Sequence, residues 1–209
     1  MNKNKTLLII VLVFVLLLGG AYVLYNRLAQ DAAPDQLSVQ GGAEAQTAPQ
    51  SEKPQQNTGG SGDESTEPEK ILAPDFTVYD SEGNEVHLSD FTGKPIVLNF
   101  WASWCGPCKM EMPDFDDAYA ELGEDVHFLM VNMTSGRETL ESATSFIEEQ
   151  GYSFPVYYDT DADAAMTYGI YSLPTTLFID AEGYGIAQAT GAINAETLQR
   201  GIDMISPKK

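Results

Sequence analysis

The sequence contains few cysteines, few histidines and few basic residues. Of its 209 residues, two are Cys, two are His and 11 are Lys or Arg, against 31 Asp and Glu, which gives a formal net charge of −20. Two cysteines exclude a scaffold of several disulfides. A structural zinc site takes four Cys or His ligands, and we interpret His87 and His127 as ordinary strand residues, so we expect no metal. The shortage of basic residues argues against binding to nucleic acid or to anionic lipid.

One long hydrophobic run interrupts this otherwise polar chain. Residues 7–25 carry no charge and are numerous enough for a helix that crosses a bilayer. Lys3 and Lys5 precede the run and acidic residues predominate after it, which predicts a cytoplasmic N-terminus and an extracytoplasmic remainder. A cleaved signal peptide ending near Gly19–Ala21 is the alternative, but the apolar run continues beyond that site. We therefore expect residues 1–28 to be an uncleaved, single-pass membrane anchor.

The composition changes twice after the anchor. Residues 29–70 contain no aromatic residue and are rich in Gln, Gly, Pro, Ser, Thr and acids, so they cannot bury a core and we predict a disordered acidic tether. Residues 71–209 have the mixed composition of one ordinary domain. This domain contains 23 acidic and 6 basic residues, a balance that favours solubility.

Hydrophobic periodicity within the domain alternates between strand and helix patterns. We expect a hairpin over 74–88, strands at 96–102, 126–133, 175–180 and 185–190, and helices at 106–122, 138–150, 164–168 and 194–205. The helix at 138–150 is expected to bury Leu140, Phe146 and Ile147. This order predicts an α/β fold in which a mixed central sheet is flanked by helices and preceded by a β-hairpin.

Both cysteines lie in one stretch, Cys105-Gly106-Pro107-Cys108, directly after an apolar strand pattern. A structural disulfide stabilises mainly by closing long loops, so a bridge across two residues gains little. A cysteine at the start of a helix faces unpaired N–H groups and the positive end of the helix dipole, which favours its thiolate. The pKa of cysteines in such motifs falls to about 3.5 to 7.5. We therefore interpret Cys105 as a redox nucleophile and Cys108, one turn later, as the resolving thiol.

The stretch "FWASWCGPC" resembles the active site of the thioredoxin superfamily, and residues 71–209 resemble the TlpA/ResA-type membrane-anchored thiol-disulfide oxidoreductases related to AhpC/TSA. The resemblance implies a thioredoxin fold with a redox-active Cys105–Cys108 disulfide and no further cofactor. It implies that Leu173-Pro174-Thr175 contains a cis proline beside Cys105 and pairs with a substrate peptide. Trp104, Gly106 and Pro107 would then contact the substrate as well.

Two departures from ordinary thioredoxin lie near the motif. Thioredoxins resemble this strand but carry a buried Asp six residues before the first cysteine, where this chain has Asn99. Glu111 instead follows Cys108 by three residues, as in the TlpA/ResA type, where this glutamate is implicated in the acid-base behaviour of the cysteines. We predict that Glu111 has a raised pKa and relays the proton of Cys108. The alternative is a solvated helix glutamate.

Two other functions of the same fold fit less well. Peroxiredoxins share the hairpin opening, but their Pro-x-x-x-Thr-x-x-Cys arrangement is replaced here by Leu98 and Ala102. A copper-delivery module would need cysteines spaced differently and a late histidine.

We therefore predict an extracytoplasmic thiol-disulfide oxidoreductase that reduces secreted or membrane-attached proteins. The resemblance implies apocytochrome c as the substrate, with an extracytoplasmic methionine sulfoxide reductase as the alternative, and a membrane thiol carrier as electron donor.

Overall fold

The computed structural model describes residues 37–39 and 70–206. The predicted anchor and most of the predicted tether lie outside these residues. In the described ranges, no helix is long and apolar enough to cross a membrane.

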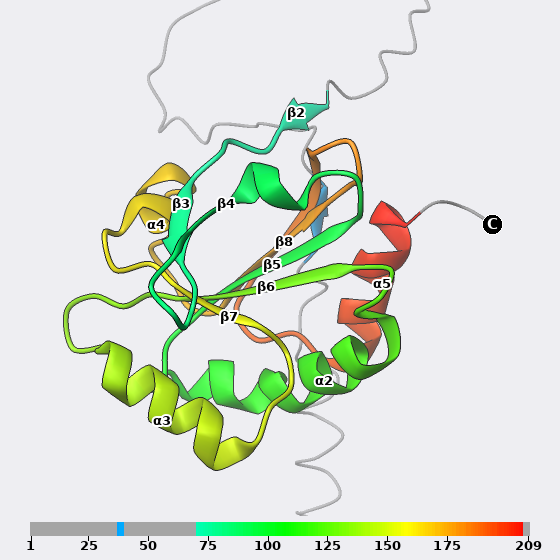
Figure 1. The fold of residues 1–209 in the computed structure, drawn as a ribbon. Coiled ribbons are helices and arrows are strands. Elements are labelled where there is room, and N and C mark those ends of the chain that lie inside the picture. Colours follow the sequence, from blue (N-terminus) through cyan, green and yellow to red (C-terminus); the bar gives the residue numbers. More distant parts are fainter. Residues whose placement is uncertain (1–36, 40–69, 207–209) are drawn as a thin grey trace, which may run out of the picture. The chain divides into compact units, whose positions relative to one another are not determined.

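One mixed sheet forms the centre of the domain (Figure 1). Its strand order is β1-β9-β8-β5-β6-β7-β3-β4, and β2 pairs with β9 as well. The strands are β1 (Ser38–Val39), β2 (Ile71–Leu72), β3 (Thr77–Tyr79), β4 (Glu85–His87), β5 (Ile96–Trp101), β6 (His127–Asn132), β7 (Val156–Tyr158), β8 (Thr175–Ile179) and β9 (Tyr184–Thr190). β5, β6 and β7 are parallel, whereas β8 runs antiparallel to β5. The predicted mixed sheet and the hairpin β3–β4 are thereby confirmed.

The helices cover both faces of this sheet. Side chains of α2 (Gly106–Leu122), α3 (Leu140–Gln150) and α5 (Ala195–Ile205) share one buried core. The 3-10 helix η1 (Leu88–Phe91) and α4 (Asp163–Thr167) contribute to a second core with the hairpin. In Figure 1, α2 and α3 lie along one side of the sheet and α4 lies beside β3. All six residues of β5 are buried because this strand lies between the two cores.

The start of α3 corrects the predicted helix at 138–150. Thr139 is the N-cap, and its hydroxyl accepts a hydrogen bond from the Ser142 N–H at 3.1 Å, so the helix begins at Leu140. Glu138 is therefore in the preceding loop and is buried. The prediction that Leu140 lies on the buried face was also wrong, because its side chain is 50% exposed in the first turn.

A short strand lies within the segment predicted as a disordered tether. Ser38 pairs with Gln188 and Val39 with Ala187 on the outer edge of β9, and Leu37 packs against the core. An edge strand offers unpaired N–H and C=O groups to any extended segment, which explains this pairing. The prediction of disorder is therefore wrong for these residues.

Candidate active site

Cys105 stands where β5 has ended and α2 begins. It is the N-cap of α2, with extended backbone angles, and its Sγ accepts a hydrogen bond from the Cys108 N–H at 3.2 Å. Pro107 fits the first turn because an N–H at that position has no partner inside the helix. The strand-to-helix junction thus aims the backbone N–H of Cys108 at the Cys105 sulfur, and the N-terminus of the helix stabilises negative charge there.

The two cysteines form a disulfide in this structure, with Cα atoms 5.3 Å apart. Cys105 is 4% exposed and Cys108 is fully buried. Cys105 is therefore the sulfur that an incoming reagent meets first. Gly106 and Pro107, between them, are exposed.

Glu111 is buried beneath the motif, on the turn of α2 that follows Cys108. Its side chain is 1% exposed, which excludes the solvated helix glutamate. Oε1 accepts a hydrogen bond from Nδ2 of Asn99 at 2.9 Å, and Oε2 accepts one from the Ile193 N–H at 3.0 Å. Asn99 also donates to Oγ1 of Thr176 at 3.0 Å, so it joins Glu111 to β8.

Burial dominates the ionisation of Glu111. Loss of solvation raises the pKa of Glu111 from 4.5 to about 7, although the hydrogen bonds from Ile193 and Asn99 act in the opposite direction. A nearby acidic residue, Asp114, adds to the rise. The carboxyl group can therefore take up and release a proton near neutral pH.

The loop between β6 and α3 holds the residues just before the nucleophile. Glu138 accepts hydrogen bonds from the Ser103 N–H at 2.8 Å and from the Ser103 hydroxyl at 2.9 Å. Trp104 is 45% exposed. The Arg137 guanidinium stacks on its ring, with Cζ of Arg137 3.7 Å from the ring centroid. Sequence reasoning missed this loop because Glu138 was placed in the helix predicted at 138–150.

The peptide bond between Leu173 and Pro174 is cis, as predicted. Leu173 packs against the core that contains both cysteines, and Thr175 begins β8 with its hydroxyl bonded to the Ser172 carbonyl at 2.9 Å. The structure thus places this segment and the motif against one core.

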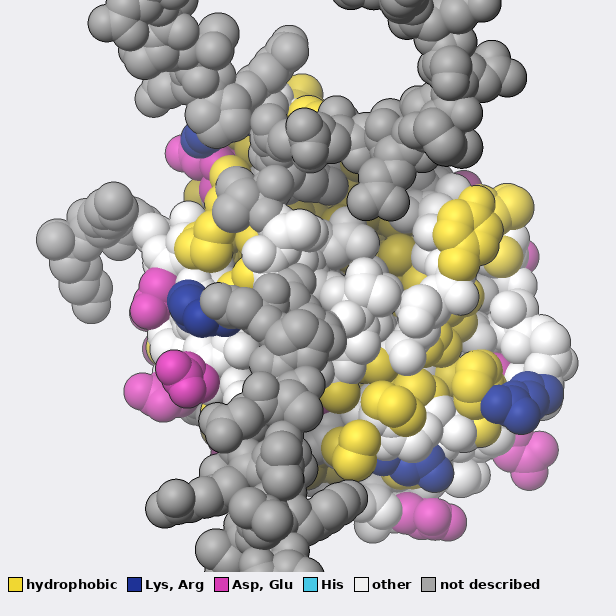
Figure 2. All heavy atoms as spheres, turned by 180° about the vertical axis from the view of Figure 1, so that it is seen from behind, with side chains coloured by type: hydrophobic (Ala, Val, Ile, Leu, Met, Phe, Trp, Pro, Cys, Tyr) yellow, Lys and Arg dark blue, Asp and Glu magenta, His cyan; other side chains and the backbone are white. Residues whose placement is uncertain are grey.

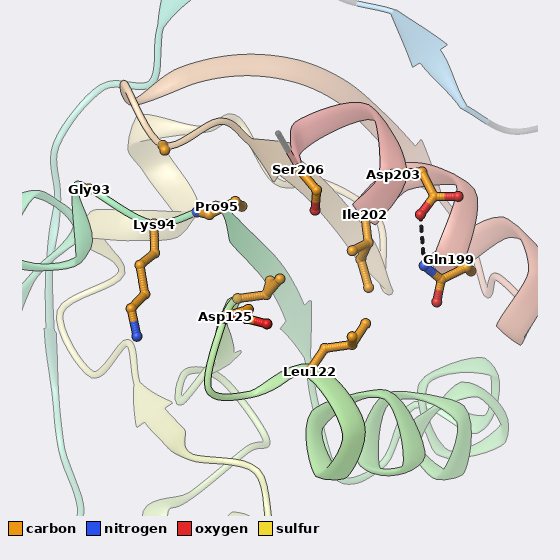
Figure 3. Close-up of a pocket in the computed structure, with 11 residues that line it drawn as sticks. Gly93, Lys94, Pro95, Leu122, Asp125, Gln199, Ile202, Asp203 and Ser206 are labelled. Atoms are coloured by element: carbon orange, nitrogen blue, oxygen red, sulfur yellow. Dashed lines mark hydrogen bonds between the residues drawn. The ribbon is translucent and has the colours of Figure 1, made fainter. Parts of the chain in front are cut away.

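Other features of the described residues lie away from the disulfide. In the ranges that the structure covers, no group of three or more His, Cys, Asp and Glu side chains could hold a metal ion. A cavity of about 590 Å³ lies between the ends of α2 and α5 and the residues before β5, at the opposite end of β5 from Cys105. Figure 3 shows Leu122 and Ile202 pointing toward each other across it, and we assign it no role.

The fold and the buried cysteine pair at a strand-to-helix junction define a thioredoxin-like thiol-disulfide oxidoreductase. The sequence profile of the AhpC/TSA family matches residues 71–184. The chain therefore belongs to the AhpC/TSA family and is a thiol-disulfide oxidoreductase of the ResA type.

Similar proteins support this assignment to the ResA type. The chain is 36% identical over 136 residues to thiol-disulfide oxidoreductase ResA of Geobacillus kaustophilus, covering 65% of this chain and 76% of that protein. ResA of Bacillus subtilis is 33% identical over 136 residues, covering 65% and 74%. The crystal structure of the pneumococcal exposed lipoprotein thioredoxin Etrx1 from Streptococcus pneumoniae is 31% identical, with a TM-score of 0.56, covering 62% of this chain and 98% of that one.

Proposed function

We propose that this chain is a membrane-anchored, extracytoplasmic reductant of protein disulfides, with Cys105 and Cys108 as the reacting dithiol. The observation that carries the proposal is the cysteine pair at the N-terminus of α2 with a buried carboxylic acid one turn below it. This arrangement supplies a stabilised thiolate, a second sulfur within reach and a proton acceptor.

The reaction begins with the reduced dithiol. The Cys105 thiolate attacks one sulfur of a substrate disulfide, a bond forms between the two sulfurs, and the other substrate sulfur leaves as a thiolate that takes a proton. The helix N-terminus supports this step because it lowers the cost of holding Cys105 as a thiolate. The product is a mixed disulfide between Cys105 and the substrate.

Cys108 resolves the mixed disulfide. Its thiol must lose a proton before its sulfur attacks Cys105, and this site is closed to water because Cys108 is fully buried. Glu111, with a pKa raised by burial to about 7, is the acceptor that we assign to this proton. The substrate leaves with two thiols, two electrons have been transferred, and the Cys105–Cys108 disulfide remains.

The direction and the location rest on sequence features. The Gly-Pro pair between the cysteines matches thioredoxin, whose potential of about −270 mV makes it a reductant. The apolar run at residues 7–25 supports an anchor with the domain outside, and the similar Etrx1 is described as an exposed lipoprotein. Electrons would then arrive from a membrane protein that carries thiols.

Substrate binding is assigned to the surface around Cys105. Trp104, Gly106 and Pro107 are exposed beside the sulfur. Leu173-Pro174-Thr175 would pair with the substrate backbone, as the family resemblance implies. We propose apocytochrome c as the substrate, and a methionine sulfoxide reductase is the alternative that the experiment below distinguishes.

Replacement of Cys108 tests the proposal directly. The full-length Cys108→Ala protein in its native membrane cannot resolve the mixed disulfide, so substrates should stay bound to Cys105 and be identified by mass spectrometry after non-reducing separation. Cys105→Ala is the matched control and should capture nothing. Capture of an apocytochrome c supports the leading substrate, and capture of a methionine sulfoxide reductase the alternative. If Cys105 in this variant still reacts with an alkylating reagent but captures no extracytoplasmic protein, the proposal is wrong.

A further inference from the structure

Two cations lie beside the disulfide of this acidic domain. Arg137 is stacked on the ring of Trp104, the residue before Cys105, with Cζ 3.7 Å from the ring centroid. Lys109 follows Cys108 directly, and its Nζ lies 5.4 Å from the centroid of the Phe146 ring on α3. Both cations therefore lie on the side of the motif that faces α3 and the loop before it.

Arg137 projects from a loop that is fixed in place. The next residue, Glu138, is 4% exposed and accepts three hydrogen bonds, two from Ser103 and one from Nδ2 of Asn132 at 2.9 Å. These bonds join the loop to the residues before Cys105 and to the end of β6. Because its neighbour is anchored, Arg137 is held over Trp104 with little loss of side-chain freedom when a ligand binds.

Neither cation is neutralised within the described part of the chain. Both side chains are exposed, and neither forms an ion pair with a residue in the ranges 37–39 and 70–206. Glu138 and Glu111, the buried carboxyl groups nearest the motif, are already bonded to Ser103, Asn132, Asn99 and Ile193. The remaining Lys and Arg of the described part belong to other regions, at Lys70, Lys94 and Arg200. On the face drawn in Figure 2, basic side chains lie beside apolar side chains at the lower right.

We propose that Arg137, with Lys109 as a second cation, binds a carboxylate side chain next to the disulfide of the substrate protein. This inference rests on the proposed function and specifies the substrate class, a disulfide flanked by Asp or Glu. Trp104 offers an apolar surface to the substrate chain while the guanidinium edge remains free for a bidentate carboxylate contact. The 23 acidic residues of the domain repel an acidic partner at long range, so the local cations offset that repulsion where the sulfurs meet.

Paired peptides provide the test, because the long-range field repels the Glu peptide to nearly the same extent in the parent and in variants that each lose one positive charge. Two peptides share one intramolecular disulfide and differ only by Glu or Gln beside the cysteine. Rate constants for their reduction are measured with the full-length reduced protein and with Arg137→Gln. The rate constant for the Glu peptide divided by that for the Gln peptide should be about 1.5- to fivefold higher for the parent than for the variant, which is the range of an exposed ion pair. Lys94→Gln, at the other end of β5, should keep the parent ratio.

Two results would contradict the inference. Equal ratios in the parent and in Arg137→Gln overturn it, and this includes a variant that slows both peptides by the same factor, because Arg137 would then act on Cys105 and not on the substrate carboxylate. A parent protein that reduces neither peptide overturns the proposed function, and the inference with it. Reduction of both peptides with the same ratio in the parent and in Arg137→Gln leaves the proposed function standing and removes the inference alone.

Discussion

Replacing Glu111 by glutamine keeps the shape of the side chain and removes its charge, at a position that is 1% exposed. Burial raises the pKa of this carboxyl group from 4.5 to about 7, so the folded state binds the proton more tightly than the unfolded chain. The contribution of Glu111 to the free energy of unfolding is then highest below about pH 4.5 and falls as the pH rises to about 7. Glutamine does not titrate, so the variant should not show this fall in the free energy of unfolding between pH 4.5 and about 7.

The size of the effect follows from the pKa and the hydrogen bonds. A rise from 4.5 to about 7 corresponds to about 3 kcal/mol of lost stability across that window. The glutamine keeps an acceptor for Asn99, but its amide group cannot accept the N–H of Ile193, which costs about 1 kcal/mol. Near pH 4 the variant should therefore be less stable than the parent, by the roughly 1 kcal/mol of the lost hydrogen bond. Above pH 7 it should be more stable than the parent by about 2 kcal/mol.

Denaturant unfolding of the oxidised protein at several pH values measures this difference. The disulfide removes both thiols from the titration, and buried Asp159, whose pKa is also raised by burial, contributes equally to parent and variant. In the reduced variant, alkylation of the thiolate should shift to lower pH because a nearby negative charge is gone. Turnover of a disulfide substrate near neutral pH should fall because the proton acceptor is gone.

The reasoning is refuted by a parent and a variant whose stabilities differ by the same amount at every pH. Such a result would mean that Glu111 has an ordinary pKa in the folded protein. Unchanged turnover, with the stability difference present, would instead remove Glu111 from the proton transfer. A folding defect cannot imitate these results, since the variant is expected to gain stability above pH 7.

Three further predictions follow from single contacts. In the reduced protein an alkylating reagent should label Cys105 first, because Cys105 is 4% exposed and Cys108 is fully buried; peptide mass spectrometry that finds Cys108 labelled first would reverse their roles. Asn99→Asp places a second carboxylate beside the buried glutamate, so unfolding experiments at pH 5 and pH 8 should show a steeper loss of stability than in the parent, and an equal loss would contradict this. Gly201→Ala would place a methyl group against the ring of Phe178, so we expect a loss of about 1 to 3 kcal/mol in denaturant unfolding, and a variant as stable as the parent would contradict this.

Local sequence patterns predicted the elements that carry the nucleophile. The apolar run of β5 and the helix pattern after it are continuous in the sequence, so the position of Cys105 at their junction could be deduced without tertiary information. The cis bond before Pro174 followed from the family resemblance and is confirmed. The helix predicted from Gly106 to about Leu122 agrees with α2, whose first turn contains Pro107.

Contacts between distant residues could not be predicted in this way. The bond between Asn99 and Glu111 joins residues on β5 and α2, and the bond from Ile193 crosses 82 positions of the chain. Glu138 fits a helical pattern, but the hydroxyl cap at Thr139 starts the helix after it and leaves the carboxylate facing Ser103. The hydrogen-bond partners of Glu111 and of Glu138 therefore lie on other elements, whose positions depend on tertiary packing.

The contacts of Asn99 explain why this chain has asparagine where thioredoxins carry a buried aspartate. Nδ2 of Asn99 donates to Glu111, and Oδ1 of Asn99 is buried without a hydrogen-bond partner in the described structure. An amide has both a donor and an acceptor end, so rotation of this side chain offers a donor to the carboxylate and an acceptor to the protonated acid. An aspartate would offer only acceptors and would add a second negative charge. Asn99 therefore suits a neighbour that changes its protonation state, and Glu138, which accepts three hydrogen bonds, suits a carboxylate that holds a loop in place.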